Sequence, residues 1–294
     1  MRVTDKMIFD NAATSSGRAR EQTEQAVSEV SSGMRVVHPW DDPGAAGLAV
    51  GHTMSAARFT AIGETVGRAS DELGAADGAL GQFNDLLTRA NQLAIQMSNS
   101  SYSAADRGDA ASQAQSMVSQ AVALLNTRFG DRYLFGGNKD DQPPFDPAGN
   151  YVGDDAVRQV EIAPGELEDA SVRADVIAKG VGGGVDILTA LQSFSTALST
   201  NDLPTIQGTI TSVTSAISQV SAGRSRLGEA MNLFDTAAET SRIAVAAEQT
   251  STSKLVEIDA IESATRLAFA QRGLDAALTA SARSFDLTLL SKLQ

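Results

Sequence analysis

Few side chains in this 294-residue sequence are of types that could bind a metal or act in acid–base catalysis. It contains no cysteine and only two histidines, His38 and His52, fourteen residues apart. A zinc site would need both histidines together with carboxylates, because there are no thiolate ligands. The sequence shows no such cluster, so we expect no metal site.

Pairs of aspartates occur at residues 41–42, 140–141 and 154–155. Such pairs could bind calcium or act as acid and base, but no loop has the spacing of an EF-hand, and adjacent aspartates commonly form turns. The glycine-rich stretch 180–184 lacks the Lys-Ser or Lys-Thr of a phosphate-binding loop, which favours a flexible linker. We predict no catalytic residue and no bound cofactor, and expect the chain not to be an enzyme.

The composition favours a helical protein without nucleic-acid or membrane partners. The net charge is −13, so no basic face for phosphates is expected. No apolar run of about 18 residues could cross a membrane, and residues 1–20 lack the apolar segment of a cleavable secretory signal. Aromatic residues make up only 5% of the chain, so the core must consist mainly of Ala, Leu, Val and Ile, which suits closely packed helices.

The clearest periodicity lies between residues 62 and 97, where apolar residues recur at alternating spacings of four and three. This pattern predicts about 54 Å of helix at 1.5 Å per residue. A similar seam runs from Ile206 to Val245, with Arg224 as its one charged member. We expect both seams to form the core of a helical bundle. The positions of the first seam are Ile62, Val66, Ala69, Leu73, Ala76, Leu80, Phe83, Leu87, Ala90, Ala94 and Met97.

Three positions carry helix-start signals. Asp42 before Pro43 predicts an N-cap followed by proline at the first helical position. Ser103 and Asp106 resemble a capping pair, and Asp186 would cap a helix that begins at residue 187. The helix that follows Ser103 is expected to run to about residue 128.

The helical pattern breaks between residues 128 and 146. Tyr133–Phe135 has strand character, and the three prolines that follow exclude a helix. Period-two patterns at residues 157–162 and 171–177, with a turn at Pro164–Gly165, predict two strands. We therefore expect a small, acidic, β-rich insert.

The two terminal segments, residues 1–40 and 254–294, have thin apolar stripes that polar residues interrupt. Paired with each other they would still leave apolar surface exposed, which favours packing between subunits. Trp40 could anchor a partner, although an ordinary packing role is the better interpretation. The expected interface residues are Phe9, Val27, Val30, Met34, Val37, Leu267, Leu274, Leu278, Phe285 and Leu289.

Two stretches resemble signatures of the flagellin family. Residues 31–50, SSGMRVVHPWDDPGAAGLAV, resemble S-G-x-R-V-x-x-P-S-D-D-P-x-A, with Trp40 where the family usually has serine. Residues 128–146, RFGDRYLFGGNKDDQPPFD, resemble G-R-Y-I/L-F-x-G…PF. The likeness extends over nearly the whole chain. The matching residues include Arg35, Pro39, Asp41, Asp42 and Pro43 in the first stretch, and Arg132, Tyr133, Phe135 and Gly137 in the second.

The resemblance implies an extracellular structural protein of the bacterial flagellum, exported unfolded through the flagellar type III apparatus. It favours a subunit that joins the hook to the filament, in a ring of identical copies held by packing of terminal helix seams. Its partners would be itself, a neighbouring hook-associated protein, flagellin and an export chaperone. A filament-forming flagellin is the alternative. A third interpretation, from another class, is an enzyme or binding module that uses the acidic insert.

Pattern and resemblance together predict a mainly α fold with a small β-rich inserted domain. The helices would form an elongated antiparallel bundle or coiled coil in which the N- and C-terminal helices pair. The expected parts are an N-terminal coiled-coil helix (1–42), the first half of a helical rod (43–130), a β-rich outer domain (131–182), the second half of the rod (183–249) and a C-terminal coiled-coil helix (250–294).

Overall fold

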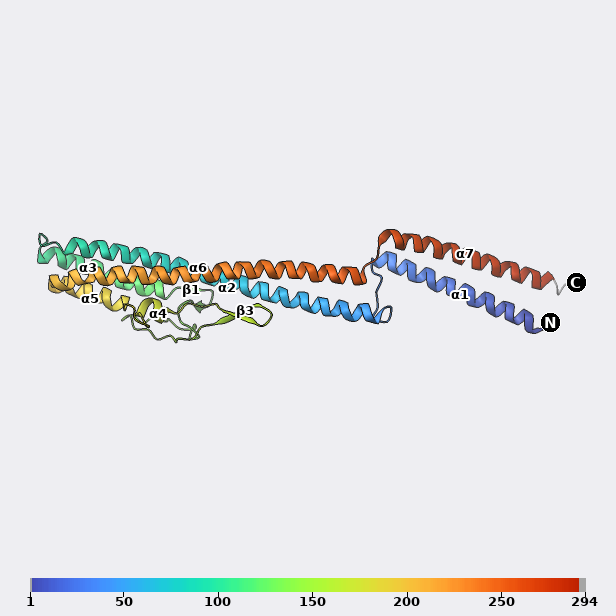
Figure 1. Ribbon diagram of the computed structural model, residues 1–294, viewed down its shortest axis with the longest axis horizontal. Helices are drawn as coiled ribbons and strands as arrows, with labels where there is room; N and C mark the ends of the chain where they lie inside the picture. Colours follow the sequence, from blue (N-terminus) through green and yellow to red (C-terminus); the bar gives the residue numbers. More distant parts are fainter. Residues whose placement is uncertain (1, 291–294) are drawn as a thin grey trace. The chain divides into compact units, whose positions relative to one another are not determined.

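The computed structural model describes the backbone of residues 2–290 and the side chains of residues 6–7 and 9–283. The predicted fold class, mainly α with a small β insert, is confirmed (Figure 1). No helix in this part of the chain is both long and apolar enough to cross a membrane. The elements are α1 (Arg2–Ser32), α2 (Pro43–Met97), α3 (Ala104–Leu125), β1 (Arg128–Phe129), β2 (Arg132–Tyr133), β3 (Gln159–Ala163), β4 (Glu166–Asp169), α4 (Ala174–Lys179), α5 (Ile187–Thr200), α6 (Leu203–Val256) and α7 (Ala260–Leu290).

The chain divides into two compact units. The terminal unit comprises the residues up to Arg58 and those from Ala244 onward, and the body comprises Phe59–Ile243. Helix α6 continues past the seam that ends at Val245, through the polar residues 248–253, to Val256. The five-part division of the chain stays a prediction.

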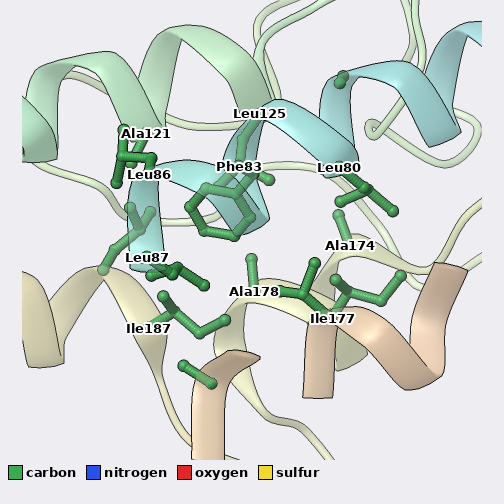
Figure 2. Close-up of a cluster of buried hydrophobic side chains, with 14 of the residues drawn as sticks. Leu80, Phe83, Leu86, Leu87, Ala121, Leu125, Ala174, Ile177, Ala178 and Ile187 are labelled. Atoms are coloured by element: carbon green, nitrogen blue, oxygen red, sulfur yellow. The ribbon is translucent and has the colours of Figure 1, made fainter. Parts of the chain in front are cut away.

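The body is a bundle of α2, α3, α5 and α6 around one apolar core (Figure 1). All eleven residues of the predicted seam at 62–97 are buried, so this prediction is confirmed. Leu86 and Leu93, outside that seam, are buried as well, because a helix inside a bundle buries a stripe wider than a coiled-coil seam. Figure 2 shows Phe83 and Leu87 of α2 gathered with Leu125 of α3 and neighbouring apolar side chains.

The charged member of the α6 seam is neutralised across the bundle. Arg224 donates two hydrogen bonds to Asp77 of α2, Nε to Oδ1 at 2.8 Å and Nη2 to Oδ2 at 3.0 Å. These bonds raise the pKa of Arg224 above its usual value. A bidentate arginine–carboxylate pair explains how this position tolerates a charge at the edge of an apolar seam.

A buried arginine that the sequence did not indicate closes one end of the body. Arg107 donates to the backbone oxygens of Met97 at 2.9 Å and Asn99 at 2.8 Å, and to Oδ1 of Asn201 at 2.6 Å. Its cation therefore caps the carbonyl of Met97, the last residue of α2, and shares the Asn99 carbonyl with the N–H of Tyr102. Nothing in the local pattern around Arg107 distinguishes it from a solvent-exposed arginine.

The β-rich insert differs in detail from the prediction. The turn at Pro164–Gly165 is confirmed, and it joins β3 and β4 as an antiparallel hairpin. The second predicted strand, at 171–177, is wrong: the strand is β4, and residues 174–179 form α4. Three of the four β4 residues are exposed, so the strand lacks the apolar alternation that would reveal it. The strand predicted at Tyr133–Phe135 is also partly wrong. Strand β2 ends at Tyr133, and the buried Phe135 lies in a turn.

The glycine-rich stretch 180–184 forms an ordered turn rather than only a flexible linker. Gly180 ends α4 in the left-handed conformation, at φ 68°, and its carbonyl accepts from the N–H of Gly184 at 2.8 Å. Gln219 of α6 accepts from Val185 N–H at 2.8 Å and donates to the Ile177 carbonyl at 2.8 Å. Gln219 thus fixes the residues on both sides of the turn to α6.

The three predicted helix starts are confirmed. Asp42 Oδ1 accepts from Ala45 N–H at 3.0 Å before α2, and Ser103 and Asp106 form a reciprocal capping box before α3. Asp186 Oδ1 accepts from the N–H of Thr189 at 3.1 Å before α5. Helix α3 ends at Leu125, three residues before the expected position.

Candidate assembly surface

The terminal unit has almost no apolar core of its own. Among its described residues only four apolar side chains are buried, Ala26, Val36, Ala45 and Ala49. Thirteen of the twenty exposed large apolar side chains described in the chain lie in this unit, although it holds little more than a third of the residues. They are Met7, Phe9, Val27, Val30, Met34, Val37, Trp40, Leu48, Val50, Met54, Ile261, Phe269 and Leu278.

Helices α1 and α7 lie side by side and run antiparallel within this unit (Figure 1). Thr23 Oγ1 lies 3.2 Å from the Ala270 carbonyl, and Glu29 Oε2 lies 3.6 Å from Arg266 Nη1. The contact face of α1 consists of small or polar residues, so the pairing buries little apolar area. These residues are Ala12, Ser16, Ala19, Thr23, Ala26 and Glu29.

The predicted interface residues on α1 and in the turn that follows it lie outside this contact. Val27 is 46% exposed, and Phe9, Val30, Met34 and Val37 are exposed to a similar degree. On α7, Leu278 is 52% exposed, whereas Leu267 and Leu274 are half-buried. Phe285 and Leu289 lie outside the residues whose side chains are described. The helix pair therefore leaves Val27, Val30, Met34, Val37 and Leu278 exposed, where they can pack against another molecule.

The first family-like stretch forms the turn between α1 and α2. Arg35 Nη2 donates to the Leu255 carbonyl of α6 at 2.9 Å, and Nη1 donates to Asp42 Oδ2 at 3.0 Å. Arg35 N–H also donates to the Val256 carbonyl at 2.7 Å. A cation at the last carbonyls of a helix is favourable because it complements the helix dipole. One arginine thus joins the end of α6 to the start of α2.

The two aspartates of this turn have separate structural roles. Asp41 Oδ2 accepts from the N–H groups of Val37 at 3.0 Å and His38 at 2.7 Å. Asp42 caps α2, and the N–H of Ala45 together with the Arg35 guanidinium lowers the pKa of its carboxyl group. Pro43, which begins α2, lies at a position where no N–H is needed. The acidic pair acts in turn formation, as predicted.

Trp40 does not have the ordinary packing role expected for it. Its side chain is 74% exposed, and the ring stacks on His38 with centroids 4.5 Å apart. The other histidine, His52, pairs with Glu248 at 2.5 Å. Across the described residues, no group of three or more His, Cys, Asp or Glu side chains could hold a metal ion.

The second family-like stretch anchors the insert within the body. Arg132 pairs with Asp140 at 2.5 Å, and Arg128 lies over the ring of Tyr133 at 5.1 Å. Phe135 is buried in the core. Gly137 has φ 68°, and a Cβ there would clash with Asp154, so glycine is required for both reasons. These contacts hold the insert together.

Two further residues of this anchor were not found from the sequence. The side chain of Asn126, directly after α3, brackets the Phe145 backbone, with Nδ2 donating to the carbonyl at 2.8 Å and Oδ1 accepting from the N–H at 2.9 Å. The Tyr151 hydroxyl donates to the Asp154 carbonyl at 2.7 Å, and burial raises its pKa to about 12. An asparagine after a helix and one tyrosine in an acidic loop are too common to signal these contacts.

Comparison with known proteins agrees with this geometry. The family model of the bacterial flagellin N-terminal helical region matches residues 3–140. Flagellar hook-associated protein 3 of Escherichia coli (strain K12) is 30% identical over 157 residues, which cover 52% of this chain and 49% of that protein. The flagellin of Listeria innocua serovar 6a is 27% identical over 214 residues, which cover 71% of this chain and 69% of that flagellin.

The fold also resembles that of a solved structure. Flagellar hook-associated protein-3 from Legionella pneumophila superposes with a TM-score of 0.62 at 14% identity, covering 69% of this chain and 98% of the other. The chain spans about half the length of the hook-associated relatives it matches. The N-terminal helical region of the chain, residues 3–140, is therefore similar to that of the bacterial flagellins.

Proposed function

We propose that this chain is a structural subunit of the bacterial flagellum that joins the hook to the filament. One observation carries the proposal: among the side chains that the structure describes, the terminal unit holds thirteen of the twenty exposed large apolar ones and buries four apolar ones. Exposed apolar area on this scale marks a protein–protein contact surface. The similarity to hook-associated protein 3 supports the flagellar hook–filament junction as the assembly in which that contact would be made.

The proposed arrangement is a ring of identical copies, held by the apolar faces of α1 and α7. Its neighbours would be another hook-associated protein on one side and flagellin on the other. Export would proceed unfolded through the flagellar type III apparatus with the help of a chaperone, so the mature protein would be extracellular. A terminal unit with a minimal core supports this, since most of the stability of a helix in a protein comes from packing of its apolar face.

Aspartate substitution on α7 tests the proposal. Leu274→Asp and Leu278→Asp should leave the soluble protein folded but prevent its incorporation into flagella. Leu278 is the cleaner position, because its exposed side chain contributes little to the fold of its own chain. Leu167→Asp is the matched control, since Leu167 is similarly exposed but lies on β4 of the body.

The assay is swimming and immunodetection in a strain without the native copy. We expect both α7 variants to abolish swimming and the control to swim. Normal swimming of the Leu278→Asp strain would show that this face makes no essential contact.

A filament-forming flagellin remains the second candidate, because the similarity to the Listeria flagellin extends over more of the chain. Electron microscopy of the concentrated, purified protein distinguishes the two. Long regular filaments of this protein alone would identify a flagellin. A folded species without filaments would support a junction subunit that needs the hook as template.

A further inference from the structure

Charge is segregated along α1. Residues 11–20 contain Arg18 and Arg20 and no acidic residue, whereas residues 21–30 contain Glu21, Glu24 and Glu29 and no basic one. Both arginines are exposed, and within the described part of the chain neither makes an ion pair. Exposed arginines are common, so this basic segment becomes informative only beside a matching acidic site.

Glu29 provides that site, because its negative charge is buried and only weakly compensated. Its side chain is 8% exposed, between α1 and α7. Gln25 Nε2 donates to it at 3.0 Å, and Arg266 Nη1 is 3.6 Å away. The Arg266 guanidinium is held more closely by Glu262, at 2.7 Å. A buried carboxylate is costly unless a cation pairs with it closely.

Two hollows give access to this carboxylate from outside. One, of about 430 Å³, lies between α1 and α7 above the small residues Ala26, Ala270 and Gly273. The other, of about 260 Å³, lies between α1 and the turn after it, and Glu24 lines it. Gln25 and Glu29 line both hollows, so the two meet at the buried carboxylate.

The basic segment cannot reach Glu29 within one molecule. Arg20 and Glu29 are nine residues apart on one continuous helix, or about 13.5 Å at 1.5 Å per residue. Their pairing requires a second molecule. A head-to-tail contact between the two patches repeats from copy to copy, as a ring requires, whereas a two-fold contact would stop at a dimer.

We propose that residues 17–20 of a second copy of this chain dock in these hollows, with Arg18 and Arg20 beside Glu24 and Glu29. This inference rests on the proposed function, because it names the contact between neighbouring subunits. We identify residues 17–20 of a second copy as the occupant because their charge complements that of the site. The second hollow has an acidic excess, because Glu24, Glu29 and Asp41 line it with Arg35 as its one arginine. It is therefore complementary to the one part of α1 that has cations and no anions. Open space around Gly17 leaves room for the approach of a second helix.

The absence of cysteine makes a direct test possible. Gly17→Cys and Ser28→Cys would place one thiol in the basic segment and one in the second hollow, both at exposed positions. Within one helix these sites are about 16.5 Å apart, beyond the roughly 4.4–6.8 Å between the Cα atoms of a disulfide. Any disulfide in the double variant is therefore intermolecular, formed when an added oxidant such as copper phenanthroline takes the two thiol hydrogens and electrons.

Mild oxidation of flagella that contain the Gly17→Cys/Ser28→Cys variant should give a ladder of multimers on non-reducing gels, and the single variants should remain monomers. Adding Arg18→Glu and Arg20→Glu should abolish the ladder. A double variant that stops at dimers would show a two-fold contact instead and overturn the inference. Dimers from either single variant would place the same residue of two copies together and overturn it as well. A ladder that survives both charge reversals would also overturn it.

Failure of this inference is distinguishable from failure of the proposed function. If the double-cysteine protein is incorporated into flagella but gives no ladder, the docking contact is wrong and the junction role stands. If the protein is absent from wild-type flagella, the junction role is wrong. The ladder is then sought in the concentrated purified protein, where its absence would overturn the docking contact.

Discussion

Gly223 of α6 is the position at which the packing of the insert on the body can be tested most sharply. A Cβ added there would lie 2.7 Å from Cδ1 and 2.9 Å from Cγ1 of Ile177, a buried residue of α4. Glycine in a helix interior is ordinarily destabilising, by about 1 kcal/mol relative to alanine. At this position the clash should reverse that sign.

The expected magnitude follows from these two opposing effects. Overpacking a core by one methyl group costs about 1–3 kcal/mol. Subtracting the helix-propensity gain, we expect Gly223→Ala to lower the free energy of unfolding by about 0–2 kcal/mol. Gly228→Ala is the matched control on the same helix, because a Cβ at residue 228 meets nothing within 4 Å. The control should be stabilised by up to about 1 kcal/mol.

Urea unfolding followed by circular dichroism measures both variants and completes a double-mutant cycle with Ile177→Val. Shortening Ile177 alone should cost about 0.5–1.5 kcal/mol, as for other buried Ile→Val changes. In the Gly223→Ala background the same change should cost less or become stabilising, because it removes the Cδ1 atom that clashes. If Gly223→Ala proves as stabilising as Gly228→Ala, then Ile177 does not lie over this glycine and our account of the α4–α6 packing is wrong.

Two further predictions concern the body and the terminal turn. The pKa of Tyr151 is raised to about 12 in the native protein, so above pH 10 the unfolded chain loses the phenol proton first. The free energy of unfolding should therefore fall between pH 10 and 12, by about 1–2 kcal/mol for a half-buried group. A pH series of urea melts should show this loss in the native sequence but not in Tyr151→Phe. Phe83→Ala should lower the free energy of unfolding by about 3–5 kcal/mol, since Phe83 is wholly buried. Trp40→Ala should leave it nearly unchanged, because Trp40 is exposed; a large loss on thermal melting of Trp40→Ala would contradict its outward position.

The features that the sequence predicted well depend on residues close together in the chain. The α2 seam was predictable because apolar spacing at three and four residues places side chains on one helix face. The caps at Asp42, Ser103 and Asp186 were predictable because a capping side chain bonds to backbone two or three residues onward. The turn at Pro164–Gly165 has the same local origin.

The features that the sequence missed depend on contacts between distant segments. Arg107 reaches a residue in the loop before α6, and Asn126 brackets Phe145 across nineteen residues. Strand β4 is polar and forms by pairing with β3, so its own residues do not show the apolar alternation of a strand. None of these contacts produces a periodic pattern of apolar residues in the sequence.

The terminal helices show most clearly which features the sequence determines and which depend on tertiary packing. Periodicity alone determined that α1 and α7 are helices with apolar stripes, because helix geometry is a local property of the backbone. Whether a stripe is buried depends on which surface packs against it. Only the tertiary structure showed that α1 turns its small and polar face toward α7 and leaves Val27 and Val30 exposed.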